Sequence, residues 1–218
     1  MRTVNTLIGQ PIERTEDLRL VRGRGTFVAD IVREGQLHAV IVRSGIAHGR
    51  IRNIDASAAL KLAGVHAVIT AQDLAAASPG NAVPRVPLRL QPLPELEPFH
   101  QPMLAHDKVR YAGEPVAVVI ADTQAIAEDA HDLVEIDIEP LPAIVGRATA
   151  EGKASMLFAE HGSNVAITWS ALKGDAAAAF ATADYTRKER FYIQRHAAMF
   201  MEPRGFVAEW NEPKPATT

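Results

Sequence analysis

The chain of 218 residues contains no cysteine, few aromatic side chains and no large excess of one charge. Without cysteine it cannot form a disulfide, supply a thiolate nucleophile, hold zinc through sulfur or bind an iron–sulfur cluster by itself. The 23 Lys and Arg residues face 26 Asp and Glu residues, for a formal net charge of −3. A surface so near neutrality offers no extended field for nucleic acid, and we expect no such partner.

Long apolar runs are also missing. No stretch approaches the roughly 18 apolar residues of a membrane span, and residues 1–7 lack the apolar core of a signal peptide. We therefore expect a cytoplasmic protein. Because 47% of the residues are hydrophobic, the composition excludes wholesale disorder, and the length suits one large domain or two small ones.

Two strand–helix–strand patterns organise the first two thirds of the chain, which predicts a mixed α/β or α+β fold. The first pattern has strands at 37–43, 51–54 and 65–69, with a helix over 56–63 that Asp55 caps and Gly64 ends. The second has a continuously apolar strand over 116–121, a helix from Asp122 or Thr123 to Val134, and an alternating strand over 135–139. A further strand is expected near 26–29, at the end of a polar arm over 1–30.

Two segments interrupt this order. Residues 79–102 hold seven of the 14 prolines, which predicts an extended connection on the surface or against a partner. Residues 146–162 are small, polar and glycine-containing, and mark a domain boundary. Beyond it the sequence predicts strands at 164–169, 185–193 and 206–210 and a helix over 176–183. The expected domains are the arm (1–30), a main domain (31–145) and a last domain (160–218).

Few residues carry a recognisable chemical signature. Gly23-Arg24-Gly25 lacks the preceding strand, third glycine and following helix of a dinucleotide site. The spacings of the eight histidines match no metal motif, and no serine lies in a nucleophile elbow. The carboxylates of Glu135, Asp137 and Glu139 share one strand face and are expected to be solvated. Residues 194–205 are densest in functional groups, and form either a strand-connecting loop or a cofactor wall.

Several collinear stretches resemble the large subunit of molybdenum hydroxylases, the xanthine dehydrogenase, aldehyde oxidase and carbon monoxide dehydrogenase family. They cover nearly the whole chain. These stretches are Gly9-Gln10-Pro11, Arg14 to Asp17, Arg22 to Asp30, Leu37 to Ile51, Gly64-Val65, Asp107 to Val119, Glu139 to Ala143, Gly174-Asp175, Ala179-Phe180, Gln194-Arg195-His196 and Met201-Glu202-Pro203-Arg204-Gly205. One departure is Phe200, where the family usually has proline.

The resemblance implies an a/b hammerhead domain up to about residue 145 and the start of the molybdopterin-binding domain from about residue 160. In the family a molybdenum–pterin centre hydroxylates carbon with water, and electrons leave through iron–sulfur and FAD units on partner subunits or domains. The family's substrate glutamine, pterin loops and base glutamate lie in sequence beyond Thr218. We therefore expect no catalytic residue, no metal site and no activity in this chain alone.

The resemblance assigns a structural or interface role to the motif residues Gly113, Glu114, Pro115, Met201, Glu202, Pro203, Arg204 and Gly205. The expected role of the chain is that of an N-terminal portion or split subunit. Its partners would be the remainder of the molybdopterin-binding subunit, an iron–sulfur subunit and an FAD subunit. The alternative is a stand-alone binding or assembly module that uses the hammerhead fold.

Two further expectations concern exposure. Glu114 is expected on an exposed turn that Gly113 and Pro115 fix, so its truncation should cost less stability than Val118→Ala. The 206–210 strand is expected to be unpaired within the chain and to pair with the remainder of the enzyme or with a second copy.

Overall fold

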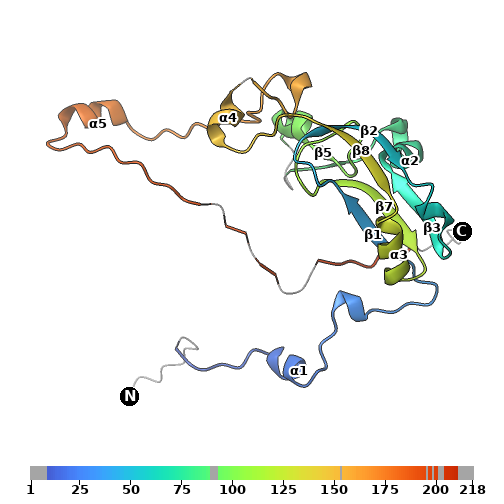
Figure 1. The fold of residues 1–218 in the computed structure, drawn as a ribbon. Helices are drawn as coiled ribbons and strands as arrows, with labels where there is room; N and C mark the ends of the chain where they lie inside the picture. The colour runs from blue at the N-terminus through green and yellow to red at the C-terminus, as the bar shows by residue number, and fades with distance from the viewer. Residues whose placement is uncertain are drawn as a thin grey trace, which may run out of the picture. The chain divides into compact units, whose positions relative to one another are not determined.

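The computed structural model describes residues 9–88, 93–152, 154–194, 196–197, 199–200 and 204–210. The chain divides into two units (Figure 1). One unit is Gln36–Asp184, and the other joins Met1–Gly35 to Tyr185–Thr218. Within the described part, no helix is long and apolar enough to cross a membrane.

The larger unit is built on a three-stranded antiparallel sheet. Its central strand β7 (Pro115–Ala121) lies between β1 (His38–Arg43) and β3 (Val65–Thr70). Helix α3 (Gln124–His131) packs on this sheet (Figure 1). Alternate residues of β7 enter two different cores, since Ala117, Val119 and Ala121 pack beneath α3 and Val116 packs in a second cluster. The predicted burial on both faces is confirmed for Ala117, Val119 and Ala121 on one face and for Val116 on the other, whereas Val118 and Ile120 are half-buried.

A second antiparallel sheet supplies the other core. Strand β2 (Gly49–Asp55) lies between β6 (Lys108–Val109) and β8 (Glu135–Pro140). On β8 the exposed Glu135 and Asp137 alternate with the half-buried Ile136 and Ile138, as the sequence predicts. The isoleucines pack on the cluster of Ala105, Val109 and Val116.

The two strand–helix–strand patterns are interleaved. β3 pairs with β7 in the first sheet and β2 pairs with β8 in the second. The first pattern contributes β1 and β3 to the first sheet and β2 to the second, and the second pattern contributes β7 to the first sheet and β8 to the second. All of these pairings are antiparallel. The mixed fold class is confirmed.

Local hydrogen bonds explain why one predicted helix does not form and why another helix, which was not predicted, does. Residues 56–63 form only a 3-10 turn, η2 (Ala59–Lys61), because the Asp55 carboxylate accepts the Ser57 N–H at 2.8 Å in a local turn. The N–H groups of Lys61 and Leu62 then bond three residues back, to Ala58 O and Ala59 O. Helix α2 (Ala71–Ala77) follows β3 directly. Its Thr70 N–H donates to the Asp73 carboxylate at 2.7 Å, a capping pattern readable from Thr70-Ala-Gln-Asp73.

The proline-rich connection contains more structure than an extended chain. It forms η3 (Pro79–Asn81), a two-residue ladder between β4 (Arg85–Val86) and β5 (Gln101–Pro102), and η4 (Pro94–Phe99). Leu96 and Phe99 on η4 are buried. The connection therefore contributes its own apolar anchors to the unit.

After β8 the structure holds short helices and extended chain. These are α4 (Arg147–Glu151), η5 (Ala159–His161) and α5 (Ala176–Thr182), whose first turn the Asp175 carboxylate caps at 2.9 Å from the Ala178 nitrogen. The strands predicted at 164–169 and 185–193 are wrong for the described residues there, since neither joins a ladder. Residues 206–210 join no ladder with the described residues either, as expected, and their pairing with another chain stays a prediction. A strand pattern forms a sheet only where a partner strand is available, and Asn164 instead bonds the loop before it through its side chain.

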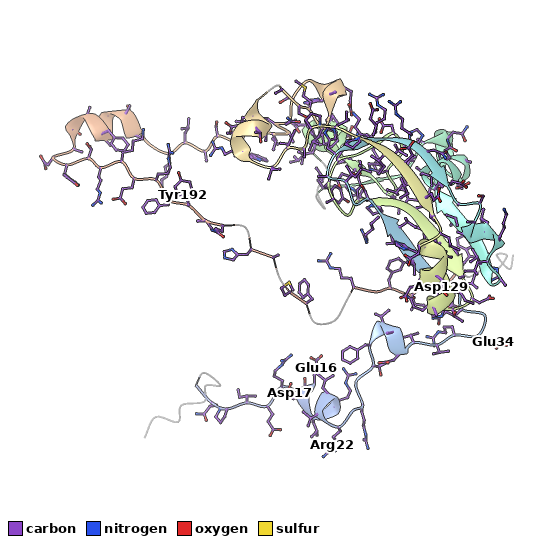
Figure 2. All side chains as sticks on the ribbon, viewed as in Figure 1. Glu16, Asp17, Arg22, Glu34, Asp129 and Tyr192 are labelled. Carbon is purple, nitrogen blue, oxygen red and sulfur yellow. The ribbon has the colours of Figure 1, made fainter. Side chains whose placement is uncertain are left out.

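The smaller unit contains α1 (Asp17–Val21) and η1 (Val28–Asp30). The strand predicted near 26–29 is wrong, because the Asp30 carboxylate accepts the Phe27 N–H at 2.9 Å and folds the chain into a 3-10 turn. Gly23 has a positive φ and its N–H donates to Leu20 O, so this glycine ends α1. Tyr192 lies exposed on the extended segment of this unit (Figure 2).

The alanines of α3 give a test of the first core. Ala127 is fully buried against the sheet, whereas Ala125 on the same helix is exposed. We expect Ala127→Leu to lower the free energy of unfolding by about 2 kcal/mol through overpacking. Ala125→Leu should change it by less than about 0.5 kcal/mol, because Leu and Ala have similar helix propensities. Urea denaturation of both variants checks this, and equal effects would contradict the assigned helix face.

Candidate functional site

The Gly113-Glu114-Pro115 turn is joined to the end of β1 by backbone hydrogen bonds. Gly113 has φ +87°, a conformation that favours glycine. Its N–H donates to Ser44 O at 2.7 Å, and the Ser44 N–H donates to Glu114 O at 2.9 Å. Arg43 Nη1 donates to Gly113 O at 2.9 Å. The turn is therefore held rigidly where β7 begins.

The expectation that Glu114 is exposed is wrong. Glu114 is only 1% exposed, and its Oε2 accepts the backbone N–H of Arg110. Oε1 is buried and has no hydrogen-bond partner among the described residues. Burial disfavours the charged form and raises the pKa of the Glu114 carboxyl above its usual range, against the opposing effects of the Arg110 N–H and the Arg110 charge.

A second buried polar side chain, His48, lies at the start of β2. Its Nδ1 is 2.9 Å from Pro142 O, and a carbonyl oxygen only accepts, so Nδ1 carries the proton. The Leu141 N–H donates to His48 O at 2.8 Å. His48 thus fixes the chain that leaves β8, while its Nε2 is buried without a partner among the described residues.

Arg110 connects the second sheet to the segment 157–160. Its side chain is only 9% exposed, and Nε donates to Leu157 O at 3.1 Å. The guanidinium lies 4.8 Å from the centroid of the Phe158 ring, which in turn packs edge-on against Phe99 at 5.1 Å. Glu160 Oε1 lies 3.7 Å from Nη2. One buried cation therefore docks this segment on the sheet through charge, hydrogen bonding and ring contact.

The predicted motif residues lie in different units. Gly113, Glu114 and Pro115 belong to Gln36–Asp184, whereas Arg204 and Gly205 belong to the smaller unit. Met201, Glu202 and Pro203 lie outside the described residues. The guanidinium carbon of Arg204 is 5.9 Å from the Phe200 ring centroid, and a Cβ on Gly205 would lie 2.9 Å from Val28 Cγ1. Gly205 therefore permits close packing against the N-terminal arm.

The other candidate groups have ordinary surroundings. Among the three carboxylates on the β8 face (Glu135, Asp137 and Glu139), Glu139 is ion-paired on the surface, because Arg52 Nη2 donates to it. Across the residues that the structure describes, no three His, Asp or Glu side chains form a group that could hold a metal ion. His66 bonds Asp122 at 2.6 Å on the surface.

The sequence did not predict that the polar side chains of Arg110, His48 and Glu114 lie in the interior. Nothing local marks Arg110 as buried, because its acceptor Leu157 lies 47 residues later. His48 and Glu114 each carry a polar group into the interior next to a glycine, at Gly49 and Gly113. That adjacency is the one signal that could have found them.

The raised pKa of Glu114 predicts a distinctive pH dependence. A carboxyl whose folded-state pKa is raised contributes stability that is fully present below the unfolded pKa of about 4.3 and is lost as pH rises through the folded value. We expect wild type to lose stability relative to Glu114→Gln over this interval, with a limiting slope of about 1.4 kcal/mol per pH unit. Urea melts of both proteins from pH 4 to pH 8 measure the difference. Parallel curves would contradict a titrating Glu114.

Comparison with known proteins assigns these elements to families. The model for the aldehyde oxidase and xanthine dehydrogenase a/b hammerhead domain matches residues 22–142, and that for a molybdopterin cofactor-binding domain matches residues 157–217. Solved structures that resemble the chain include reconstituted CO dehydrogenase from Oligotropha carboxidovorans, at 39% identity and TM-score 0.55 over 67% of this chain and 17% of that one. Another is the aldehyde oxidoreductase from Desulfovibrio gigas, at 30% identity and TM-score 0.57 over 66% of this chain and 16% of that one.

Curated relatives match over nearly the whole chain. The nicotine 6-hydroxylase large subunit of Paenarthrobacter nicotinovorans is 39% identical over 95% of this chain and 25% of its own length. The carbon monoxide dehydrogenase large chain of Hydrogenophaga pseudoflava is 37% identical over 91% of this chain and 25% of its own length. The chain thus spans about a quarter of the curated relatives it matches. It belongs to the aldehyde oxidase and xanthine dehydrogenase family, with an a/b hammerhead domain followed by molybdopterin-binding domain sequence.

Proposed function

We propose that this chain forms the hammerhead domain and the opening of the molybdopterin-binding domain of a molybdenum hydroxylase large subunit. Its own role is structural and in assembly, either as the N-terminal portion or as a split subunit. The observation that carries the proposal is the order of the two family matches, 22–142 and 157–217, together with the docking of segment 157–160 on the hammerhead domain by Arg110. The proposed boundaries remain an arm (1–30), a hammerhead domain (31–145) and an incomplete last domain (160–218).

The described residues of the last domain do not by themselves fit a pterin–molybdenum group. The cavity there is lined by Leu93, Glu95 and residues 165–169, so that its one charged lining residue is acidic. A phosphate-bearing cofactor needs donors and cations instead. We therefore propose that the cofactor site of the complete enzyme is built mainly by other residues.

The exposed apolar side chains of the last segment support a role in assembly. Phe206 and Trp210 are 86% and 84% exposed, and Phe191 and Ile193 are 81% and 88% exposed. Large apolar side chains gathered in one segment are a common mark of an interaction surface. We propose that the remainder of the molybdopterin-binding subunit covers them, with an iron–sulfur subunit and an FAD subunit completing the enzyme in the cytoplasm. Because these 218 residues contain no cysteine, we propose that the iron–sulfur clusters are held by residues outside this sequence, on a partner subunit or domain.

Affinity purification of the tagged chain from its native source tests the proposal. The expected complex contains a polypeptide with the remaining molybdopterin-binding sequence, identified by mass spectrometry, and about one molybdenum per tagged chain by elemental analysis. A Phe206→Ser/Trp210→Ser double variant should keep its stability but lose this complex. Val145→Ser, which alters an exposed apolar residue of the other unit, is the control and should retain it.

Two outcomes would overturn the proposal. Stoichiometric molybdenum with oxidoreductase activity in the isolated chain would show that the chemistry lies here. A stable complex without molybdenum and without molybdopterin-binding sequence would instead favour the stand-alone module. Light scattering on the isolated chain shows whether a second copy covers the same segment.

A further inference from the structure

Residues 185–193 of the smaller unit form an extended segment that joins no ladder with the described residues (Figure 1). The segment contains no proline, so each of its residues carries a backbone N–H donor and a C=O acceptor. Among the residues that the structure describes, none forms a hydrogen bond with these backbone groups. Such a row of donors and acceptors is a template for pairing with another strand.

The side chains of this segment alternate as they do in a strand. Arg187 Nη2 pairs with the Glu189 carboxylate, and Arg190 Nη1 donates to the Tyr192 hydroxyl at 3.4 Å (Figure 2). Each contact joins residues two apart, and such residues share a face in an extended chain. The conformation of a strand is therefore present, although no described residue supplies the ladder partner.

The two faces of the segment differ in chemistry. Beside the Arg187–Glu189 pair, the first face carries three exposed large side chains, those of Tyr185, Phe191 and Ile193. The second face carries Lys188 and Arg190, and neither pairs with a carboxylate in the part of the chain that the structure describes. A complementary strand would present apolar side chains to the first face and a carboxylate to the second.

We propose that a strand from the remainder of the molybdopterin-binding subunit adds to residues 185–193 through backbone hydrogen bonds, an inference that rests on the function proposed above. Main-chain bonds supply affinity in this mode of binding, and alternate side chains supply specificity. The molybdopterin cofactor-binding domain model matches 157–217, which includes the segment, and this chain spans 25% of the nicotine 6-hydroxylase large subunit. Such relatives contain ample further sequence from which the strand can come.

A second copy of this chain is a poorer partner for the segment. Antiparallel self-pairing over its full length would place Lys188 opposite Arg190, and Glu189 opposite Glu189 of the second copy. Like charges directly opposite each other in a ladder are destabilising. The charge pattern therefore favours a different strand, one that carries a carboxylate opposite Lys188 or Arg190.

Hydrogen exchange followed by mass spectrometry tests the pairing, on the full chain alone and on the complex purified through its tag from the native source. The amides of 185–193 should exchange rapidly in the isolated chain and about a hundredfold more slowly in the complex. Strand β7 is the internal reference, because its amides lie between two paired strands in both states and should exchange slowly in both.

Proline substitutions separate backbone pairing from burial of side chains. Neighbouring N–H groups of a strand point to opposite edges, so Thr186→Pro and Arg187→Pro remove one donor from each edge. At least one of them should lower recovery of the partner polypeptide about tenfold, whereas Thr186→Ala and Arg187→Ala should stay within about twofold of wild type. Both positions are exposed and join no ladder, so the fold should persist, which circular dichroism verifies.

A charge reversal tests the carboxylate of the added strand. Lys188→Glu should lower recovery of the partner about fivefold, because it replaces an opposite-charge pair by a like-charge pair, and Lys188→Arg should retain it. Equal recovery with Lys188→Glu and wild type would overturn the assignment of a carboxylate to the partner strand.

The remaining outcomes distinguish this inference from the proposed function. A complex that contains the molybdopterin-binding polypeptide but leaves the amides of 185–193 unprotected overturns the inference alone, as do proline variants that match their alanine counterparts. A complex without that polypeptide overturns both. Protection that already appears in a dimer of the isolated chain would assign the segment to a second copy and overturn the proposed partner.

Discussion

Glu114→Ala should lower the free energy of unfolding by about 2–3 kcal/mol, the reverse of what an exposed turn residue would do. The substitution removes the acceptor of the Arg110 N–H, and a buried donor without a partner costs about 1–3 kcal/mol. It also leaves a void where a fully buried side chain had been. The loss is moderated because the substitution also removes a carboxyl that burial penalises when charged.

Val118→Ala should cost less, about 1 kcal/mol. Val118 is only half-buried on β7 and lies outside both clusters of buried residues. Truncating a partly exposed valine removes less packed surface than truncating a fully buried side chain. Chemical denaturation at pH 7 gives both values.

Glu114→Gln is the matched control, because its amide oxygen can still accept the Arg110 N–H and its volume is conserved. We expect it to recover most of the stability that Glu114→Ala loses. If Glu114→Ala unfolds within about 0.5 kcal/mol of wild type, the range of ordinary surface substitutions, the carboxyl is not the buried acceptor that the structure places there.

The elements that were predictable from the sequence are those with local causes. The apolar run of β7, the alternation of β8 and the Thr123 side chain that accepts the Ile126 N–H at 3.2 Å at the start of α3 all act within a few residues. Gly64, with φ +88°, ends the turn before β3 as expected. Such signals need no knowledge of what lies elsewhere in the chain.

The parts that were not predictable depend on contacts distant in sequence. Glu114 resembles an exposed turn residue, and only the end of β1, 70 residues earlier, shows that Arg43 and Ser44 hold its turn against the sheet. Arg110 resembles a surface cation until Leu157 O, 47 residues later, accepts its Nε N–H. The pattern of 206–210 is that of a strand, yet a strand needs a ladder partner that none of the described residues supplies. The assignment of β2 and β3 to different sheets also follows from long-range pairing with β8 and β7. Periodicity shows which face of a strand is buried, but it does not show which other strand pairs with it.

Gly49→Ala is the substitution with the largest expected effect, a loss of about 3 kcal/mol or more. Gly49 is buried on β2 between two neighbours, paired with Val109 of β6 and with Pro140 of β8. An added Cβ would overlap Ile138 Cγ2 and lie 2.9 Å from the backbone oxygen of Glu139. The Ile138 side chain could turn aside. The backbone of Gly49 cannot, because β2 is paired on both sides, so the strain enters the sheet itself.

Gly45→Ala separates this steric cause from the general effect of replacing glycine. Gly45 lies four residues earlier on the exposed loop before β2, and a Cβ there would meet nothing within 4 Å. We expect Gly45→Ala to stay within about 0.5 kcal/mol of wild type, or to gain slightly because alanine restricts the unfolded chain. Thermal and urea melts compare the two variants directly. If both variants unfold alike, β2 is not the central strand between β6 and β8, and the second sheet must be ordered differently.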